Sequence, residues 1–241
     1  MSKTEQLLAL VDSQLDSQRF KQQHWEGSFK DYLDILSQNP RAARNAFQRV
    51  YDMILHFGTQ RYTYLKQDFV HYKFFDDPFD DGADAIYGLD GAIMRLVDCF
   101  KSAAHGYGTD HRILLLHGPV GSSKSTLARL MKKGLEYYSR LDEGALYTFS
   151  WSLENEDGQV EILPCPMHEE PLKLIPRQAR KDVLAQLNAD LPEDQQVRLE
   201  GDLDPFCRRM FQDLLLKYEG DWRRVLDHVI VRRLVLSEKD R

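Results

Sequence analysis

An apolar run, a glycine-containing turn and a Lys-Ser-Thr sequence follow one another between residues 113 and 126. This order predicts a buried strand, a phosphate-binding loop and the first turn of a helix, because such a turn aims backbone N–H groups inward and a helix N-terminus adds partial positive charge. Lys124 is placed to pair with the β- and γ-phosphates of a nucleotide, and Ser125 to ligate Mg²⁺. The predicted nucleotide-binding residues of this loop are Gly118, Pro119, Val120, Gly121, Ser122, Ser123, Lys124, Ser125 and Thr126.

One position departs from the P-loop pattern G-x-x-x-x-G-K-[ST]. Ser123 stands where the pattern has its second glycine, a residue that lets the backbone approach a phosphate without a Cβ in the way. The alternative reading is a turn between a strand and a helix that binds nothing, but such a turn has no need of Lys-Ser-Thr at its exit. We therefore expect ATP, bound with Mg²⁺, as the ligand.

Composition excludes several other classes of protein. The 241 residues carry a formal net charge of −6, which gives no sign of a nucleic-acid-binding surface. No stretch approaches the ~20 apolar residues of a membrane span, and the N-terminus lacks an apolar signal segment. We therefore expect a cytoplasmic protein without nucleic-acid or membrane partners.

The three cysteines, Cys99, Cys165 and Cys207, are far apart in the sequence and lack CxxC spacing. An odd number of cysteines in this pattern is typical of structural thiols in a reducing compartment. The sequence Cys165-Pro166-Met167-His168 suggests a metal site only weakly, because zinc needs about four ligands and no second pair presents itself.

Residues 1 to 68 are predicted to form a helical N-terminal region. Residues 3–23 carry a partial apolar stripe, and residues 28–31 resemble a capping box that opens a short helix. Asn39-Pro40 should start a further helix that ends near Gly58. Residues 69–82 mix aromatic and acidic side chains, which favours a solvated loop anchored by its aromatic residues over a cation site. An amphipathic helix should follow, with Ile93, Leu96, Val97 and Phe100 on one face.

Beyond the glycine-containing turn, a helix is expected over about residues 124–138. Residues 145–151 alternate like a strand, and residues 160–163 could return as its partner. The remainder is predicted to be mostly helical, over residues 177–187, 204–218 and 222 to about 233.

Several segments resemble the PrkA serine protein kinases, a bacterial AAA+ family. They are, in order, residues 25–59, residues 85–104, the loop GPVGSSKST, residues 147–151, CPMHEEPLKLIP and VRRLVLSEKDR. The long N-terminal segment and HEEPLKLIP are far more specific than a P-loop alone, and together the segments span about nine-tenths of the chain. The family commonly carries glycine at the position of Ser123, so this sequence departs from it there.

The resemblance implies an α/β fold over residues 69–241, an AAA+ P-loop NTPase core in which a parallel sheet is flanked by helices. It also implies serine/threonine protein kinase activity that uses ATP and Mg²⁺ on an unidentified protein substrate, and a module that could assemble into a homo-oligomeric ring. In AAA+ ATPases an apolar-Gly segment before the P-loop often lines the adenine pocket. Residues 86–89 match it, which adds Tyr87 and Gly88 to the nucleotide-binding candidates.

No catalytic residue can be assigned. The Gly-rich, His-Arg-Asp and Asp-Phe-Gly motifs of eukaryotic-type kinases are missing from the sequence. The acid that would hold Mg²⁺ is best matched by Glu238, after the apolar residues 234–236. Because the family continues beyond this segment, we expect a truncated or split reading frame that binds ATP better than it turns it over. The alternatives are a regulatory or ring-forming module without catalysis, and a component of a Lon-like ATP-dependent protease.

Overall fold

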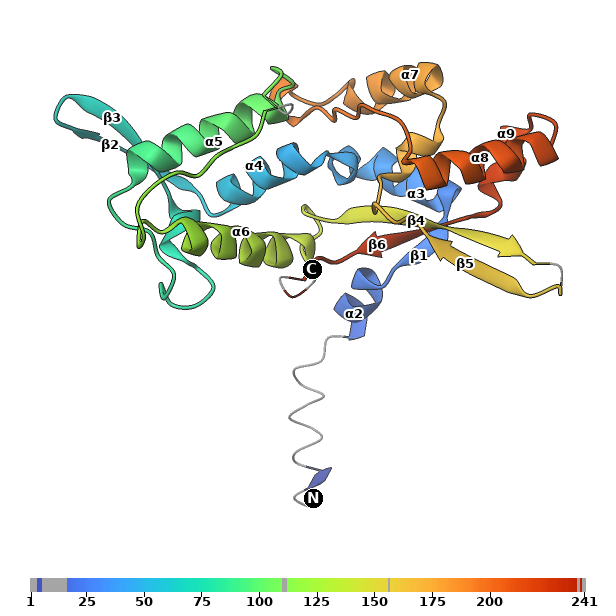
Figure 1. Cartoon of the computed structure of the whole chain (residues 1–241), viewed down its shortest axis with the longest axis horizontal. Helices are drawn as coiled ribbons and strands as arrows, with labels where there is room; N and C mark the ends of the chain where they lie inside the picture. Colours follow the sequence, from blue (N-terminus) through green and yellow to red (C-terminus); the bar gives the residue numbers. More distant parts are fainter. Residues whose placement is uncertain (1–3, 6–16, 110–111, 156, 238, 240–241) are drawn as a thin grey trace. The chain divides into compact units, whose positions relative to one another are not determined.

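The computed structural model describes residues 4–5, 17–109, 112–155, 157–237 and 239 (Figure 1). These residues form two compact units through which the chain passes more than once. The first unit contains the described residues of Met1–Ile35, Leu146–Leu174 and Asp202–Val235, and the second those of Leu36–Ala145, Ile175–Gly201 and Leu236–Arg241. Neither unit is bounded at residue 68, so the domain boundary proposed from the sequence stays a prediction.

The first unit is built on a four-stranded sheet in the order β1-β6-β4-β5, with every neighbouring pair antiparallel (Figure 1). Its strands are β1 (Glu26–Ser28), β4 (Leu146–Glu154), β5 (Val160–Pro164) and β6 (Val229–Leu234). Phe149 pairs with Val231 at the centre of the sheet, and both side chains are fully buried. The long strand β4 thus provides the middle of this core.

Helices α2 (Ser17–Gln23), α8 (Pro205–Lys217) and α9 (Trp222–Leu226) belong to the same unit, together with most of α3 (Phe29–Gln38). The predicted capping box at α3 is confirmed, because the Ser28 N–H donates to Asp31 Oδ2 over 2.9 Å and the Asp31 N–H donates to Ser28 Oγ over 3.2 Å. A short 3-10 helix, η3 (Pro171–Leu174), contributes two fully buried leucines, Leu172 and Leu174.

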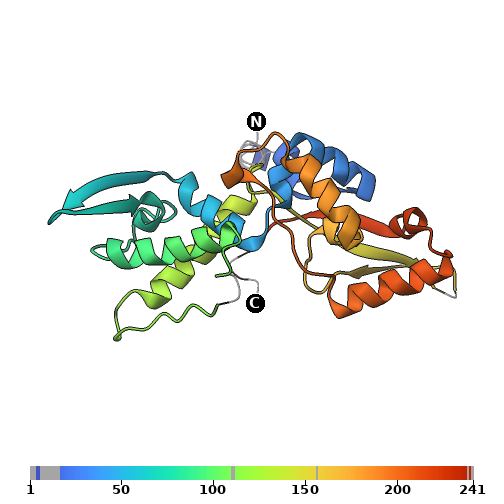
Figure 2. The same ribbon diagram turned by 90° about the horizontal axis from the view of Figure 1, so that it is seen from above.

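The second unit is mostly helical, and Figure 2 shows it from a second direction. Helix α4 (Ala46–His56) packs against α5 (Asp90–Ala104) and α6 (Lys124–Ser139). The hairpin of β2 (Thr59–Tyr64) and β3 (Gln67–Tyr72) leads into the 3-10 helix η2 (Lys73–Asp76). The remaining elements are η1 (Pro40–Ala43), α7 (Arg177–Asn188) and η4 (Glu193–Gln195). The apolar core contains Met53, Ile54, Phe74, Phe75, Ile86, Ile93, Val97, Leu130 and Tyr138.

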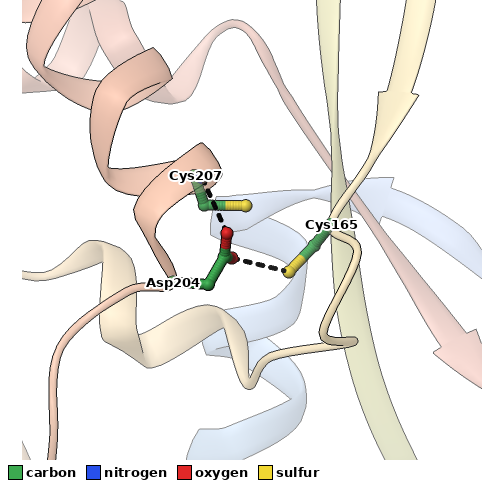
Figure 3. Close-up of side chains that lie close together, drawn as sticks. All are labelled: Cys165, Asp204 and Cys207. Carbon is green, nitrogen blue, oxygen red and sulfur yellow. Dashed lines mark hydrogen bonds between the residues drawn. The ribbon is translucent and has the colours of Figure 1, made fainter.

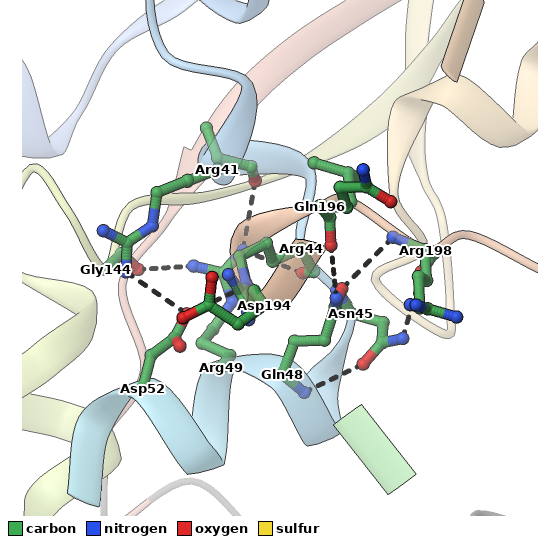
Figure 4. Close-up of polar contacts among 12 residues, drawn as sticks. Arg41, Arg44, Asn45, Gln48, Arg49, Asp52, Gly144, Asp194, Gln196 and Arg198 are labelled. Atoms are coloured by element: carbon green, nitrogen blue, oxygen red, sulfur yellow. Dashed lines mark hydrogen bonds and ion pairs between the residues drawn. The ribbon is translucent and has the colours of Figure 1, made fainter. Parts of the chain in front are cut away.

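A buried arginine on α4 links three segments of this unit (Figure 4). Arg49 Nη1 donates to the carbonyl oxygens of Gly144 and Ala145 at 2.8 Å each, and Nη2 to those of Ala42 and Arg44 at 3.1 Å each. A buried carbonyl needs a donor, so one guanidinium here satisfies four groups that helices and strands leave open.

The start of α4 is held by the side chains of Asn45 and Gln48 (Figure 4). Asn45 caps the helix and forms a capping box with Gln48. The amide of Asn45 also donates to the Arg198 carbonyl over 3.0 Å, and that of Gln48 to the Gln196 carbonyl over 2.6 Å. These contacts attach the segment after α7 to α4.

Three expectations about secondary structure are wrong. The described strands are all antiparallel, so they do not form the expected parallel sheet. The helix expected to run to about residue 233 ends at Leu226, and strand β6 follows. The segment 69–82 is not a loop throughout, because its first residues belong to β3. Residues 3 and 6–16 of the helix expected over residues 3–23 lie outside the described residues, which include residues 4–5 and the end of this helix as α2.

The expected parallel sheet is missing its strand at the apolar run 113–116, before the glycine-containing loop. Ile113 and Leu115 are 94% and 82% exposed, and residues 113–116 pair with no strand in the described part of the chain. A strand forms only where a partner edge supplies its hydrogen bonds and covers its side chains. The buried strand predicted over residues 113–116 is therefore wrong, because the described residues provide no such edge.

Candidate nucleotide-binding site

The glycine-containing loop ends where α6 begins, at Lys124. Gly121 has φ 82°, and Ser123, directly before the helix, has φ 58° and ψ 12°. Both angles lie in the left-handed region, which glycine adopts freely and serine adopts only at a cost. The requirement for glycine at position 123 is therefore present in the backbone even though the side chain is serine.

The ammonium group of Lys124 turns back into the loop. It donates to the carbonyl oxygens of Gly118 and Pro119 over 2.9 and 2.6 Å and to Ser122 Oγ over 2.9 Å. Ser122 Oγ in turn donates to the Pro119 carbonyl over 2.8 Å. The single positive charge of the loop is thus held inside it by neutral oxygen atoms, which an anionic oxygen can replace with a stronger, charge-assisted hydrogen bond.

The start of α6 is open to an anion. Ser123, its N-cap residue, makes no side-chain capping hydrogen bond, and the first turn carries no acidic side chain. The first N–H groups of any helix lack intrahelical acceptors, so an uncapped N-terminus attracts negative charge. A hollow of about 360 Å³ lies directly over this turn and the loop, lined by residues 120–126.

An apolar cavity adjoins the loop on another side. It has a volume of about 320 Å³ and shares Ser122, Ser123 and Lys124 with the hollow over the loop. Its apolar lining comes from three places in the chain: the segment before α5, α5 itself and the sequence that flanks the loop. These residues are Ile86, Leu89, Ala92, Ile93, Leu96, Leu115, Leu116 and Leu127. A pocket of this size with polar groups at one end suits a flat ring joined to a charged group.

Ion pairs hold the segment before α5 against α6. Arg129 on α6 donates to both carboxylate oxygens of Asp84, from Nε over 2.8 Å and from Nη2 over 2.5 Å. Lys133, one turn further on, contacts Asp84 over 3.0 Å and also pairs with Asp80. The hydrogen bonds from Arg129 and then Lys133 lower the pKa of Asp84, which therefore stays ionised. Asp80, within residues 69–82, and Asp84, just after them, are thus paired with basic side chains of α6.

The N-terminus of α5 is held by a histidine between two carboxylates. His71 Nδ1 lies 2.9 Å from Asp90 Oδ1, and its Nε2 lies 2.9 Å from Asp76 Oδ1. The hydrogen bond with Asp90, followed by that with Asp76, raises the pKa of His71. Since Asp90 is the first residue of α5, this contact fixes the helix that supplies Ala92, Ile93 and Leu96 to the cavity.

The structure groups most of the predicted site residues. Those of the loop, from Gly118 to Thr126, line one or both hollows. Tyr87 is 77% exposed and outside the cavity lining, which takes Ile86 and Leu89 instead of Tyr87 and Gly88. Ser125, the predicted Mg²⁺ ligand, is exposed in the first turn of α6. Glu238, the predicted acid, lies outside the described residues.

Sequence reasoning missed the cavity-lining role of Ala92, Leu96 and Leu127. Leu96 shares a helical face with Ile93, and the sequence predicts that shared face but no cavity beside it. The helical period says which side chains share a face, but not what that face encloses.

The structure contains no helix, among the residues it describes, that is long and apolar enough to cross a membrane.

One family model and two known proteins match the chain. The model of the family "PrkA AAA domain" matches residues 27–241. The chain is 35% identical over 227 residues to the "ATP-dependent protease PrkA" of Bacillus subtilis (strain 168), a match that covers 94% of this chain and 29% of that protein. It is 40% identical over 74 residues to an "Uncharacterized protein in gldA 5'region" of Geobacillus stearothermophilus, which covers 31% of this chain and 65% of that protein.

The chain therefore spans less than a third of the length of the Bacillus protein, whose N-terminal portion it matches. No solved structure matches it. The family match extends over most of the chain and confirms the resemblance drawn from the sequence segments, so the chain belongs to the PrkA AAA domain family.

Proposed function

We propose that this chain binds Mg-ATP at the loop Gly118–Thr126, with the adenine ring in the adjoining apolar cavity. The observation that supports this most strongly is the position of Lys124. Its ammonium group contacts carbonyl oxygens inside the loop, and the residue lines both the hollow over the loop and the apolar cavity. A triphosphate and a flat aromatic base need such neighbouring sites. The family to which the chain belongs is also named for its AAA domain.

Each part of the site has a separate role in this proposal. Lys124 would pair with the β- and γ-phosphates, and the N–H groups at the start of α6 would face the phosphate oxygens. Ser125 would hold Mg²⁺, which neutralises phosphate charge during phosphoryl transfer or hydrolysis. The side chains of α5 would exclude water from the base, and the ring would gain from the apolar area it buries.

Filling the cavity separates base binding from phosphate binding. We expect Ala92→Trp to weaken Mg-ATP binding at least about 10-fold and to leave inorganic triphosphate binding unchanged, because the indole occupies the base site alone. Ala128→Trp, at an exposed position of α6 outside the cavity lining, is the matched control and should bind both ligands normally. Equal affinity of the Ala92→Trp variant and the unchanged chain for Mg-ATP would disprove the base site.

The use made of the nucleotide is a second proposal. The resemblance to PrkA serine protein kinases favours phosphate transfer to a protein, whereas the name of the Bacillus relative favours ATP-dependent proteolysis. The chain spans only 29% of that relative. We therefore propose nucleotide binding for this chain and assign either activity to the full-length relative. Incubation of the full-length Bacillus relative with γ-labelled ATP and casein distinguishes these activities. Label on casein supports a kinase, and ATP-dependent fragments of casein support a protease. The absence of both label and fragments supports a binding module.

A further inference from the structure

Two cysteines that are far apart in the sequence meet in the first unit, together with an aspartate (Figure 3). Cys165 follows β5, while Asp204 and Cys207 lie at the start of α8. The two Sγ atoms and an Asp204 carboxylate oxygen all lie within 4.8 Å of one another, and all three residues are buried. His168, which the sequence pattern pairs with Cys165, is exposed and is not one of the three.

The three side chains are held on rigid backbone. The Cys165 N–H donates to the Phe149 carbonyl of β4 over 3.0 Å, which continues the pairing of the sheet. Asp204 caps α8, with Oδ1 accepting from the N–H groups of Phe206 and Cys207 over 2.9 and 3.1 Å. This leaves Asp204 Oδ2 directed at Cys165 Sγ, 3.5 Å away (Figure 3).

A backbone N–H donor and a helix N-terminus lie beside the cluster. The Glu169 N–H donates to Cys165 Sγ over 3.3 Å. The N-terminus of the 13-residue helix α8 adds partial positive charge.

We propose that Cys165, Asp204 and Cys207 form a binding site for one Zn²⁺ ion. Two thiolates and a carboxylate are a ligand set that zinc accepts, and soft sulfur ligands disfavour Mg²⁺ and Ca²⁺. Zn–S bonds of about 2.3 Å and Zn–O bonds of about 2.0 Å at tetrahedral angles place sulfur and oxygen roughly 3.5 Å apart. The separation of Cys165 Sγ and Asp204 Oδ2 has this value.

Zinc would displace a proton from each thiol and form bonds to both sulfur atoms and to Asp204 Oδ2, with no change of oxidation state. The fourth position is left for a water molecule, as in zinc sites with three protein ligands. The bound ion would join the end of β5 to α8, two elements of the same unit. The site is independent of nucleotide binding and does not rest on the function proposed above.

Cobalt provides a direct test, because Co²⁺ occupies such sites and absorbs light when it is bound to thiolate. The reduced, metal-free chain should bind about one Co²⁺ with sulfur-to-cobalt charge-transfer absorption, and Zn²⁺ should abolish this absorption by displacement. Cys165→Ser and Cys207→Ser should each reduce the charge-transfer intensity by about half or more, and Asp204→Asn, which keeps the capping oxygen, should weaken binding at least about 10-fold. Cys99→Ser removes the third cysteine, which lies in the other unit, and should change nothing.

The unmodified chain makes the test independent of how well the variants fold. Absence of charge-transfer absorption in the reduced, folded chain at millimolar Co²⁺ would overturn the proposal. Retention of full absorption by Cys165→Ser, or its loss in Cys99→Ser, would also overturn it, because the ion would then be bound elsewhere.

Discussion

Ser122 and Lys124 contact each other within the loop Gly118–Thr126, with the lysine ammonium 2.9 Å from the serine Oγ. Between them lies Ser123, whose φ of 58° sets the direction in which the loop enters α6. The left-handed conformation of Ser123 therefore lies directly before the helix that carries this lysine.

Replacement of Ser123 by glycine should relieve strain. We expect Ser123→Gly to raise the free energy of unfolding by about 1 kcal/mol, since a side chain in the left-handed region costs roughly that amount. Ser122→Gly is the control: its φ is not positive, so it should bring no gain. Urea unfolding of the two variants measures the difference, and equal effects would contradict the strain at Ser123.

A glycine in the middle of α6 allows close helix packing. A Cβ at Gly134 would lie 2.5 Å from Phe74 Cε2 and 2.7 Å from Met53 Sδ. We expect Gly134→Ala to lower the free energy of unfolding by about 1–3 kcal/mol, because overpacking of the core outweighs the better helix propensity of alanine. Gly91→Ala, in the first turn of α5, meets only Phe69 Cε1 at 3.6 Å and should be neutral or stabilising. Thermal unfolding of both variants checks the contrast.

Removal of the buried Arg49 guanidinium should be more damaging. We expect Arg49→Met to cost at least about 3 kcal/mol in the free energy of unfolding, because it leaves four buried carbonyl oxygens without their donor. Arg41→Met is the matched control, since Arg41 is partly exposed and Arg44 also pairs with its partner Asp52. Its cost should stay below about 1 kcal/mol. Similar losses in both variants would show that the carbonyl contacts of Arg49 contribute little.

The histidine beside α5 makes stability depend on pH. Its pKa is raised in the folded chain, so its contribution is fully present below the unfolded value near 6.5 and is lost as the pH rises through the higher folded value. We therefore expect the stability lost in His71→Gln to be largest near pH 6 and to shrink above it. His105→Gln, which removes an imidazole that contacts the Lys101 carbonyl, is the matched control. Urea unfolding at a series of pH values gives both curves, and identical curves for His71→Gln and the unmodified chain would exclude this role.

Local signals in the sequence predicted the elements that form locally. The capping box at Ser28, the hairpin-like return of β5 on β4 and the start of α6 at Lys124 depend on residues close together in the chain, and all three are present. Strand β6 was missed because its pairing with β1 joins opposite ends of the sequence. Its apolar and basic residues are also compatible with a helix, and only the partner strands decide between the two.

The same distinction holds for the sites. The predicted phosphate-binding loop is one continuous motif, so the sequence alone suffices to propose its residues. The cavity depends on how α5 packs beside the loop, and the cluster of Cys165 and Cys207 on how α8 lies against the end of β5. Neither arrangement leaves a spacing signature in the sequence, because tertiary packing sets both.

Calorimetric titration of the chain and its Lys124→Ala variant with Mg-ATP tests nucleotide binding most directly. We expect the unmodified chain to bind and the variant to bind about 10- to 100-fold more weakly, which is the effect of losing one charged hydrogen-bond donor. Lys132→Ala, an exposed lysine of the same helix, should bind like the unmodified chain. Equal affinity of the Lys124→Ala variant and the unmodified chain for Mg-ATP would contradict the assignment of this loop as the phosphate-binding site.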